Sequence, residues 1–260
     1  MVRARRRSGP RRSLLARAPL AVQVTLGVSA LLLLALIVNG LYQVMRKPSE
    51  LLFPVSGALY KTPEETWRSY GELFRRYATP TIPASVLAAR AQQEASGNPL
   101  VRTYWRWSWV PRPFEIYRPA SSAVGLYQIT DGTFEAARHY CVHDHAVVRE
   151  GAWDEWRGCW FNALYSRLVP ADAVELTAAY LDLTVNGILA RHARTASAAR
   201  VRHVATVVHL CGAGAADAYV RHGLRFAPQE RCGEHDPRPY LERIDALAAQ
   251  FERLAAAPPQ

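Results

Sequence analysis

The chain has 260 residues, a formal net charge of +10 and half of its residues apolar. This composition excludes a disordered or fibrous protein, and the length fits one large domain or two small ones. Seven arginines lie in the first 17 residues, which hold no acidic residue, so the rest of the chain carries 25 basic and 22 acidic residues, a net charge of +3. A nucleic-acid-binding domain needs its cations on the folded part, and we therefore expect no nucleic acid partner.

An uncharged segment of 28 residues, 18–45, follows the basic N-terminus of residues 1–17. About 20 helical residues cross a bilayer, so this segment is long enough for one transmembrane helix. Only Arg46 and Lys47 follow it directly, and this charge asymmetry predicts a cytoplasmic N-terminus, an inner-membrane span and a periplasmic remainder. A cleaved signal peptide is the alternative, but its apolar region would be only about 7–15 residues long.

The four cysteines, Cys141, Cys159, Cys211 and Cys232, all lie after the apolar segment. An oxidising periplasm would allow them to form two disulfides, for which three pairings exist. We expect Cys141 to pair with Cys159 and Cys211 with Cys232, because both bridges then close short loops.

Residues 46–61 contain prolines and a glycine without clear periodicity, which predicts a linker near the membrane. The folded domain is expected over residues 62–255. Its first helix begins with a capping box at 62–65. A second helix is expected to start after Pro83 and to end at 97–99, which places Glu94 in its last turn.

Apolar residues at three- and four-residue spacing predict further helices in the rest of the domain. They are expected at about 131–140, 153–168, 172–191 and 198–210, and from Asp236 onward. No run of strands competes with this pattern, so the fold class is all-α with one N-terminal transmembrane helix. Residues 256–260, an Ala/Pro-rich tail, are expected to be disordered.

Three segments carry a resemblance to a known family. Residues 92–99 read Gln-Gln-Glu-Ala-Ser-Gly-Asn-Pro, residues 122–130 read Ser-Ala-Val-Gly-Leu-Tyr-Gln-Ile-Thr, and residues 209–215 read His-Leu-Cys-Gly-Ala-Gly-Ala. Together they resemble the lytic transglycosylases with a soluble-type domain, which cleave peptidoglycan glycan strands. The first is similar to the family's helix-ending segment with the catalytic glutamate, the second to its Gly-Leu-Met-Gln motif, and the third lies where the family usually has Ala-Tyr-Asn-Ala-Gly-Pro-Gly. The resemblance implies a lysozyme-like domain with a small irregular or hairpin insertion.

Glu94 is the predicted acid/base. A carboxyl at the C-terminal end of a helix faces the negative end of the helix dipole, and partial burial disfavours its charge further, so we expect a raised pKa. Most glycosidases use two carboxylates, but no partner acid for Glu94 is evident here. The resemblance implies that Glu94 acts twice: it protonates the glycosidic oxygen and then takes the proton of the muramoyl 6-hydroxyl, which gives a 1,6-anhydro product without metal or cofactor. The alternative for Glu94 is a solvated residue at a helix end.

The resemblance also implies a set of residues that bind the glycan. Gly125 would let the backbone approach the sugar and Gln128 would hydrogen-bond it, while Leu126 and Ile129 enter the core. The tyrosine and asparagine of the family's third motif are replaced here by Leu210 and Cys211, so His209 or the inserted loop would have to supply the missing polar contact. The predicted substrate-binding residues are Ser96, Ser122, Gly125, Tyr127, Gln128 and His209.

Two further patterns leave alternatives open. On an extended segment, Trp105, Trp107 and Trp109 share one face, which could stack on sugars, meet a partner protein, or pack into the domain as a hairpin. Histidine and cysteine alternate at His139, Cys141, His143 and His145 and could bind zinc or copper. Because their spacing matches no standard zinc pattern and a disulfide would use Cys141, we expect no metal site.

The sequence is therefore interpreted as a single-pass inner-membrane lytic transglycosylase that opens the wall locally. It most resembles proteins carried by integrating conjugative elements, which implies peptidoglycan, the inner membrane and conjugation or secretion machinery as partners. One alternative is a non-catalytic peptidoglycan-binding scaffold subunit of such a machine. The other is a lysozyme-type hydrolase, in which water attacks instead.

Overall fold

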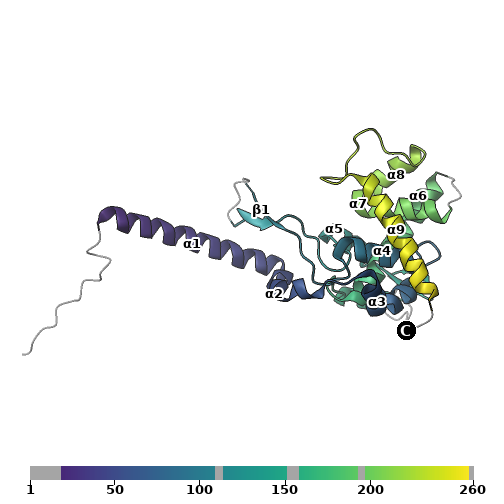
Figure 1. Cartoon of the computed structure of the whole chain (residues 1–260), viewed down its shortest axis with the longest axis horizontal. Coiled ribbons are helices and arrows are strands. Elements are labelled where there is room, and N and C mark those ends of the chain that lie inside the picture. Colours follow the sequence, from purple (N-terminus) through teal and green to yellow (C-terminus); the bar gives the residue numbers. More distant parts are fainter. Residues whose placement is uncertain (1–18, 109–113, 151–157, 193–196, 258–260) are drawn as a thin grey trace, which may run out of the picture. The chain divides into compact units, whose positions relative to one another are not determined.

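A computed structural model describes residues 19–108, 114–150, 158–192 and 197–257. Most of these residues are helical, and the strands among them are short and form two antiparallel hairpins. The chain divides into two compact units, residues 1–48 with 105–119 and residues 49–104 with 120–260. Each unit is described by itself below, with the elements labelled in Figure 1.

The first unit consists of a long apolar helix and a small hairpin. Helix α1 (Leu20–Arg46) is long and apolar enough to span a membrane, and its most apolar stretch is not buried by any other described part of the chain. Strands β1 (Trp105–Trp107) and β2 (Tyr117–Pro119) pair antiparallel and lie beside the C-terminal half of α1 (Figure 1). Two amides of α1 hold this hairpin: Asn39 Nδ2 donates to the carbonyl of Tyr117 (2.6 Å) and Gln43 Nε2 to that of Phe114 (2.8 Å).

The second unit begins with short helical turns where the sequence predicted a linker. They cover Pro48–Leu52, α2 (Phe53–Ser56) and Gly57–Leu59. Helix α3 (Pro63–Tyr77) follows, and its predicted capping box is confirmed: the Thr62 hydroxyl accepts from the backbone N–H of Glu65, whose carboxylate accepts from that of Thr62. These two bonds satisfy backbone donors that the first turn of a helix leaves without partners.

Four more helices build the core of this unit. They are α4 (Ala84–Ala95), α6 (Pro170–Arg191), α7 (Ala198–Cys211) and α9 (Pro237–Ala256), close to the predicted ranges. Helix α6 is as long and apolar as a membrane span, but most of it is buried, so its apolar residues serve the domain core. Helix α9 packs along α4 (Figure 1). Phe251 and Ile244 of α9 are fully buried.

The region between α4 and α6 differs most from the prediction. The helix expected over 131–140 ends early, as α5 (Asp131–Ala137), because residues 140–149 form a hairpin of β3 (Tyr140–His143) and β4 (Ala146–Arg149). Of the helix expected over 153–168, residues 153–157 lie outside the described residues, and the remainder has only a 3-10 turn, Trp160–Leu164. A disulfide between Cys141 and Cys159 joins this turn to the hairpin.

Two smaller differences concern the C-terminal third. The third motif contains the start of a helix that was not predicted, α8 (Ala213–Arg221), whose N-cap Gly212 has φ of +85°. Helix α9 continues to Ala256, into the tail that was expected to be disordered, and residues 258–260 lie outside the described residues.

Candidate active site around Glu94

The loop after α4 fixes where Glu94 lies. Ser96 ends the helix in the left-handed conformation (φ 46°, ψ 45°), and its N–H still donates to the carbonyl of Gln92 (2.9 Å). Gly97 has φ of +67°, and a Cβ there would lie 2.2 Å from Thr66 Oγ1, so this position requires glycine. Asn98 is fully buried and donates to the carbonyl of Ser56 (2.7 Å). The Ser-Gly-Asn segment therefore closes the helix and holds Glu94 in its last turn, as predicted.

The Glu94 carboxylate contacts side chains from two other helices. His209 Nε2, in the last turn of α7, lies 3.4 Å from Glu94 Oε1, and the hydroxyl of Tyr240, in the first turns of α9, donates to the same oxygen. The side chains of Glu94 and His209 are only 17% and 15% exposed. Glu94 is thus no solvated residue at a helix end but a largely buried acid with a small accessible surface.

A buried cation lies one helical turn before Glu94. Residues four apart lie on the same face of a helix, and Arg90 is completely buried on this face of α4. Its Nη2 donates to Thr206 Oγ1 of α7 (2.9 Å), whereas its Nε and Nη1 have no hydrogen-bond partner among the described residues. An arginine keeps its charge even when burial lowers its pKa, so Arg90 places a permanent positive charge beneath the site.

These neighbours reverse the expected pKa of Glu94. Burial is the largest single influence and raises the pKa. The charge and hydrogen bond of His209, the hydroxyl of Tyr240 and the charge of Arg90 together outweigh it, so the pKa of Glu94 lies below its ordinary value. The expectation of a raised pKa anticipated burial but not these donors, and for the protein without substrate it is wrong.

The second motif forms a tight loop that is hydrogen-bonded by Arg167. Its backbone pairs Val124 with Ile129 in both directions, and Arg167 Nη1 donates to the carbonyls of Ser122 (3.1 Å) and Ile129 (2.8 Å). Gly125 has φ of +79°, and a Cβ there would lie 2.0 Å from the carbonyl oxygen of Arg167. The close backbone approach at Gly125 is therefore to Arg167, a contact within the fold.

Most polar groups of this motif also bond within the fold. Tyr127 is fully buried and its hydroxyl donates to the carbonyl of Leu87 (3.1 Å), which removes it from any surface that a glycan could reach. Gln128 Nε2 donates to the carbonyls of Gly125 (3.0 Å) and Val101 (3.3 Å), and Ser122 Oγ accepts from the N–H of Asp131 (3.1 Å). Leu126 and Ile129 are buried, as predicted.

The structure thus brings together only part of the predicted site. Glu94 and His209 meet, and Ser96 lies two residues after Glu94 as the cap of α4. Among the described residues, no hydrogen bond or ion pair links Glu94 to the second motif. Cys211 is bonded to Cys232, which confirms the predicted pairing and leaves Cys211 structural.

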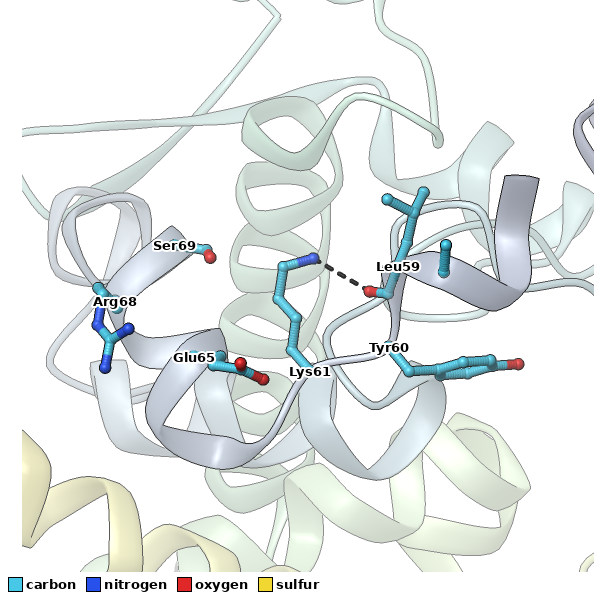
Figure 2. Close-up of a pocket in the computed structure, with 7 residues that line it drawn as sticks. Leu59, Tyr60, Lys61, Glu65, Arg68 and Ser69 are labelled. Atoms are coloured by element: carbon cyan, nitrogen blue, oxygen red, sulfur yellow. Dashed lines mark hydrogen bonds between the residues drawn. The ribbon is translucent and has the colours of Figure 1, made fainter.

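An open pocket of about 280 Å³ lies elsewhere on this unit, where α3 begins. Figure 2 shows Lys61 across it from Arg68, with Lys61 Nζ donating to the carbonyl of Leu59 (3.1 Å). None of the predicted site residues lines it; the lining residues are Ala58, Leu59, Tyr60, Lys61, Glu65, Arg68 and Ser69.

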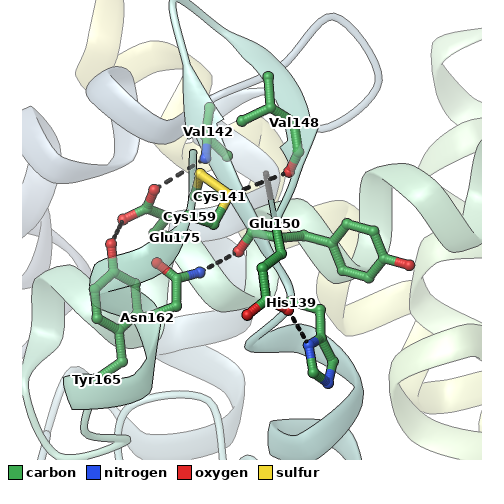
Figure 3. Close-up of a disulfide and its surroundings, with 10 residues drawn as sticks. His139, Cys141, Val142, Val148, Glu150, Cys159, Asn162, Tyr165 and Glu175 are labelled. Atoms are coloured by element: carbon green, nitrogen blue, oxygen red, sulfur yellow. Dashed lines mark hydrogen bonds and ion pairs between the residues drawn. A yellow bond between two sulfur atoms is a disulfide. The ribbon is translucent and has the colours of Figure 1, made fainter. Parts of the chain in front are cut away.

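The alternating histidines and cysteine do not converge on one point. His139 Nδ1 bonds Glu150 (2.7 Å) and Cys141 bonds Cys159, as Figure 3 shows, while His145 Nδ1 lies 2.8 Å from the carbonyl of Ala78. Within the described ranges, no three His, Cys, Asp or Glu side chains are grouped so that they could hold a metal ion.

Comparison of the chain with protein-family models, with curated proteins and with solved structures finds no match.

Three residues that define the site were missed from the sequence: Arg90, Thr206 and Tyr240. Arg90 is four residues before Glu94 and Thr206 three before His209, so helical spacing could have found both. Tyr240 lies in the helix expected from Asp236 onward, and only the packing of α9 on α4 reveals its hydroxyl at Glu94.

Proposed function

We propose that the chain is a membrane-anchored lytic transglycosylase with a lysozyme-like domain, in which Glu94 is the acid/base. The observation that carries this proposal is the environment of Glu94: a largely buried carboxylate at the end of α4, with a small accessible surface, held by His209 and Tyr240. Perturbed carboxyl groups in such surroundings are candidates for acid/base catalysis. The three sequence segments supply the reaction class.

Tyr240 and His209 compensate for the altered third motif. That motif has Leu210 where the family has a tyrosine, and a leucine cannot hydrogen-bond a carboxylate. Here a tyrosine hydroxyl reaches Glu94 from a different helix, α9, and His209 adds a second polar contact from the position directly before Leu210. The polar surroundings that a catalytic carboxyl needs are thus present although the motif has changed.

The proposed chemistry uses Glu94 twice. As an acid it gives its proton to the glycosidic oxygen between MurNAc and GlcNAc, and the bond breaks. As a carboxylate it then takes the proton of the MurNAc 6-hydroxyl, whose oxygen attacks C1 and forms the 1,6-anhydro ring. No water is consumed, and Glu94 ends protonated as it began.

The proposed location follows from α1 and the disulfides. Helix α1 is exposed, apolar and long enough to span a bilayer, and two disulfides fit an oxidising compartment. Together with the arginines before the span, this supports an inner-membrane protein with a periplasmic domain. A lyase held there acts close to the membrane, which suits local wall opening for conjugation or secretion machinery.

The test is digestion of purified sacculi by the full chain in detergent, beside Glu94→Gln. We expect 1,6-anhydro muropeptides from the wild type, detected by mass spectrometry, and a loss of about 10²–10⁴-fold in their release by the variant, because a general acid/base contributes about that factor. Glu135→Gln, at an exposed acid that pairs with Arg138 (3.4 Å), is the matched control and should retain full release. Products with reducing ends would instead identify a lysozyme-type hydrolase.

One observation favours the non-catalytic peptidoglycan-binding subunit as a second candidate. The pKa of Glu94 is lowered, and its carboxylate already binds Tyr240 and His209, so in the free protein it is ionised near neutral pH. Wild-type protein that sediments with sacculi but releases no muropeptide would identify this role. Glu94→Gln would then sediment as the wild type does.

A further inference from the structure

The β1–β2 hairpin is fixed to the C-terminal turns of α1. Residues 20–38 of α1 carry no charge, and at about 1.5 Å per residue they are long enough to cross a hydrocarbon core of about 30 Å. Asn39 and Gln43 come next and are buried, because their amides bond the hairpin backbone. The hairpin is therefore attached to the C-terminal end of the uncharged segment, which runs to Met45.

Further contacts strengthen this attachment. Arg46 Nη1 lies 2.9 Å from Glu115 Oε1, and the rings of Tyr42 and Phe114 are 5.6 Å apart. Glu115 is nearly buried, so this ion pair is shielded from solvent on one side. Successive turns of α1, from Asn39 to Arg46, thus hold the segment 114–117.

One face of the hairpin is aromatic. Trp107 is directly opposite Tyr117 in the strand register, with ring centroids 4.8 Å apart, and Trp105 lies 5.2 Å from the same tyrosine. Trp107 is nevertheless 58% exposed, and Phe114 and Ile116 nearby are exposed as well. Trp109, the third predicted member of this face, lies outside the described residues. The alternative that the hairpin buries its tryptophans inside the domain is wrong for Trp107.

The other face of the hairpin is cationic. Arg106 is directly opposite Arg118, an arrangement in which two like charges destabilise a strand pair. Arg118 has Glu115 as a partner (3.2 Å), whereas Arg106 is exposed and forms no ion pair within the described residues. An anionic group beside Arg106 would relieve this repulsion.

We propose that the β1–β2 hairpin lies in the headgroup layer of the bilayer that α1 spans, with its aromatic face against lipid and Arg106 beside anionic headgroups. Tryptophan and tyrosine concentrate at membrane interfaces, and anionic headgroups attract arginine there. A bilayer is favoured over a glycan as the occupant because the hairpin is fixed to the very segment that enters the bilayer. This inference rests on the membrane part of the proposed function and is independent of catalysis by Glu94.

The experiment uses the full chain in vesicles of phosphatidylcholine and phosphatidylglycerol, with and without phosphatidylcholine brominated near the interface, which quenches tryptophan fluorescence. Trp107→Phe removes the exposed aromatic but keeps a ring. Trp67→Phe is the matched control, since Trp67 packs against Phe74 and Phe251 in the domain core (centroids 6.2 and 5.9 Å apart). We expect brominated lipid to quench the wild type, Trp107→Phe to lose part of the quenched intensity, and Trp67→Phe to retain all of it.

Three results would overturn the proposal. The first is a quenched intensity that Trp107→Phe leaves unchanged. The second is a change in Trp107 emission caused by soluble glycan fragments but not by brominated lipid, which would make the hairpin a glycan-binding face. The third is a chain that does not float with vesicles at all, which overturns the span and the hairpin together. Muropeptide release is measured separately, so a failure of the catalytic proposal affects none of these outcomes.

Discussion

Two carboxylates of the domain each accept a hydrogen bond from a tyrosine, and their surroundings differ. Glu175 of α6 is 5% exposed and accepts from the Tyr165 hydroxyl (2.7 Å) and from the backbone N–H of Val142 (2.9 Å), as Figure 3 shows. Glu94 accepts from the Tyr240 hydroxyl and faces His209 and the charge of Arg90. Both acids are removed from bulk water, but of the two only Glu175 accepts a hydrogen bond from a backbone N–H within the described residues.

The difference separates a structural acid from a candidate catalytic one. A backbone donor cannot move without unfolding the strand that carries it, so Glu175 holds β3 against α6. Tyr240 and His209 reach Glu94 with side chains from two other helices, so its contacts involve no backbone donor among the described residues. Burial alone therefore does not point to an active-site carboxyl, whereas a buried carboxylate with side-chain donors and a nearby cation is a candidate for one.

The largest effect that tests this contrast comes from the two disulfides, one in each region. Replacing Cys141 and Cys159 together with serine should lower the free energy of unfolding by about 3 kcal/mol. A crosslink that closes a loop of this size reduces the entropy of the unfolded chain, and that reduction stabilises the folded state by about this amount. The Cys211–Cys232 pair closes a loop of similar length, a separation of 21 residues against 18, and should cost about as much to remove.

Thermal unfolding of the full chain in detergent measures both losses. Muropeptide release per folded molecule should fall only when Cys211 and Cys232 are replaced, since Cys211 is two residues after His209. Equal loss of release in both double variants would contradict the assignment of the Cys141 region to structure alone.

A smaller effect is expected from Glu175→Gln. An amide in place of this carboxylate directs a donor at a neighbouring donor, and an unsatisfied buried group costs about 1–3 kcal/mol. The melting temperature should fall while release per folded molecule stays at the wild-type level. An unchanged melting temperature would show that Glu175 does not hold β3.

The smallest effect concerns Tyr240→Phe and pH. Because the pKa of Glu94 is lowered in the folded protein, its carboxylate contributes stability that is present above the unfolded pKa of about 4.3 and is lost as the pH falls through the folded value. Removing the Tyr240 hydroxyl should raise the pKa of Glu94 and cost about 1 kcal/mol at pH 7. Wild type and variant should therefore differ less in melting temperature at about pH 3 than at pH 7, and a difference that grows on acidification would refute this.

The helices were the predictable part of the fold because their signals are local. The capping box at Thr62, the stop at Gly97 and the apolar spacing in α6, α7 and α9 each lie within a few residues. The β3–β4 hairpin was missed because its support is not local: the N–H of Val142 bonds a carboxylate 33 residues away, and Cys141 bonds Cys159. Local apolar spacing alone therefore predicts that the helix continues beyond the observed end of α5.

The candidate site, like the fold, was predictable only where its signals are local. Glu94 and His209 were named from their segments, and they meet. Tyr127, Gln128 and Gly125 were expected at the glycan, but the structure uses their polar groups and backbone to close a loop over Arg167 and the core. Family motifs mark positions, and whether a residue there serves the fold or a ligand depends on neighbours that lie far away in the sequence.

The permanent charge of Arg90 sets the charge balance of every proton transfer at this site. With Glu94 ionised, the pair is neutral overall; with Glu94 protonated, the interior holds an uncompensated cation, which low-dielectric surroundings penalise. A ligand that displaced Tyr240 and His209 from the carboxylate would remove two of the three groups that lower the pKa of Glu94, so the pKa would rise, although Arg90 would still oppose the rise. If that ligand is the proposed glycan, its binding would itself shift Glu94 toward the protonated form that a general acid needs.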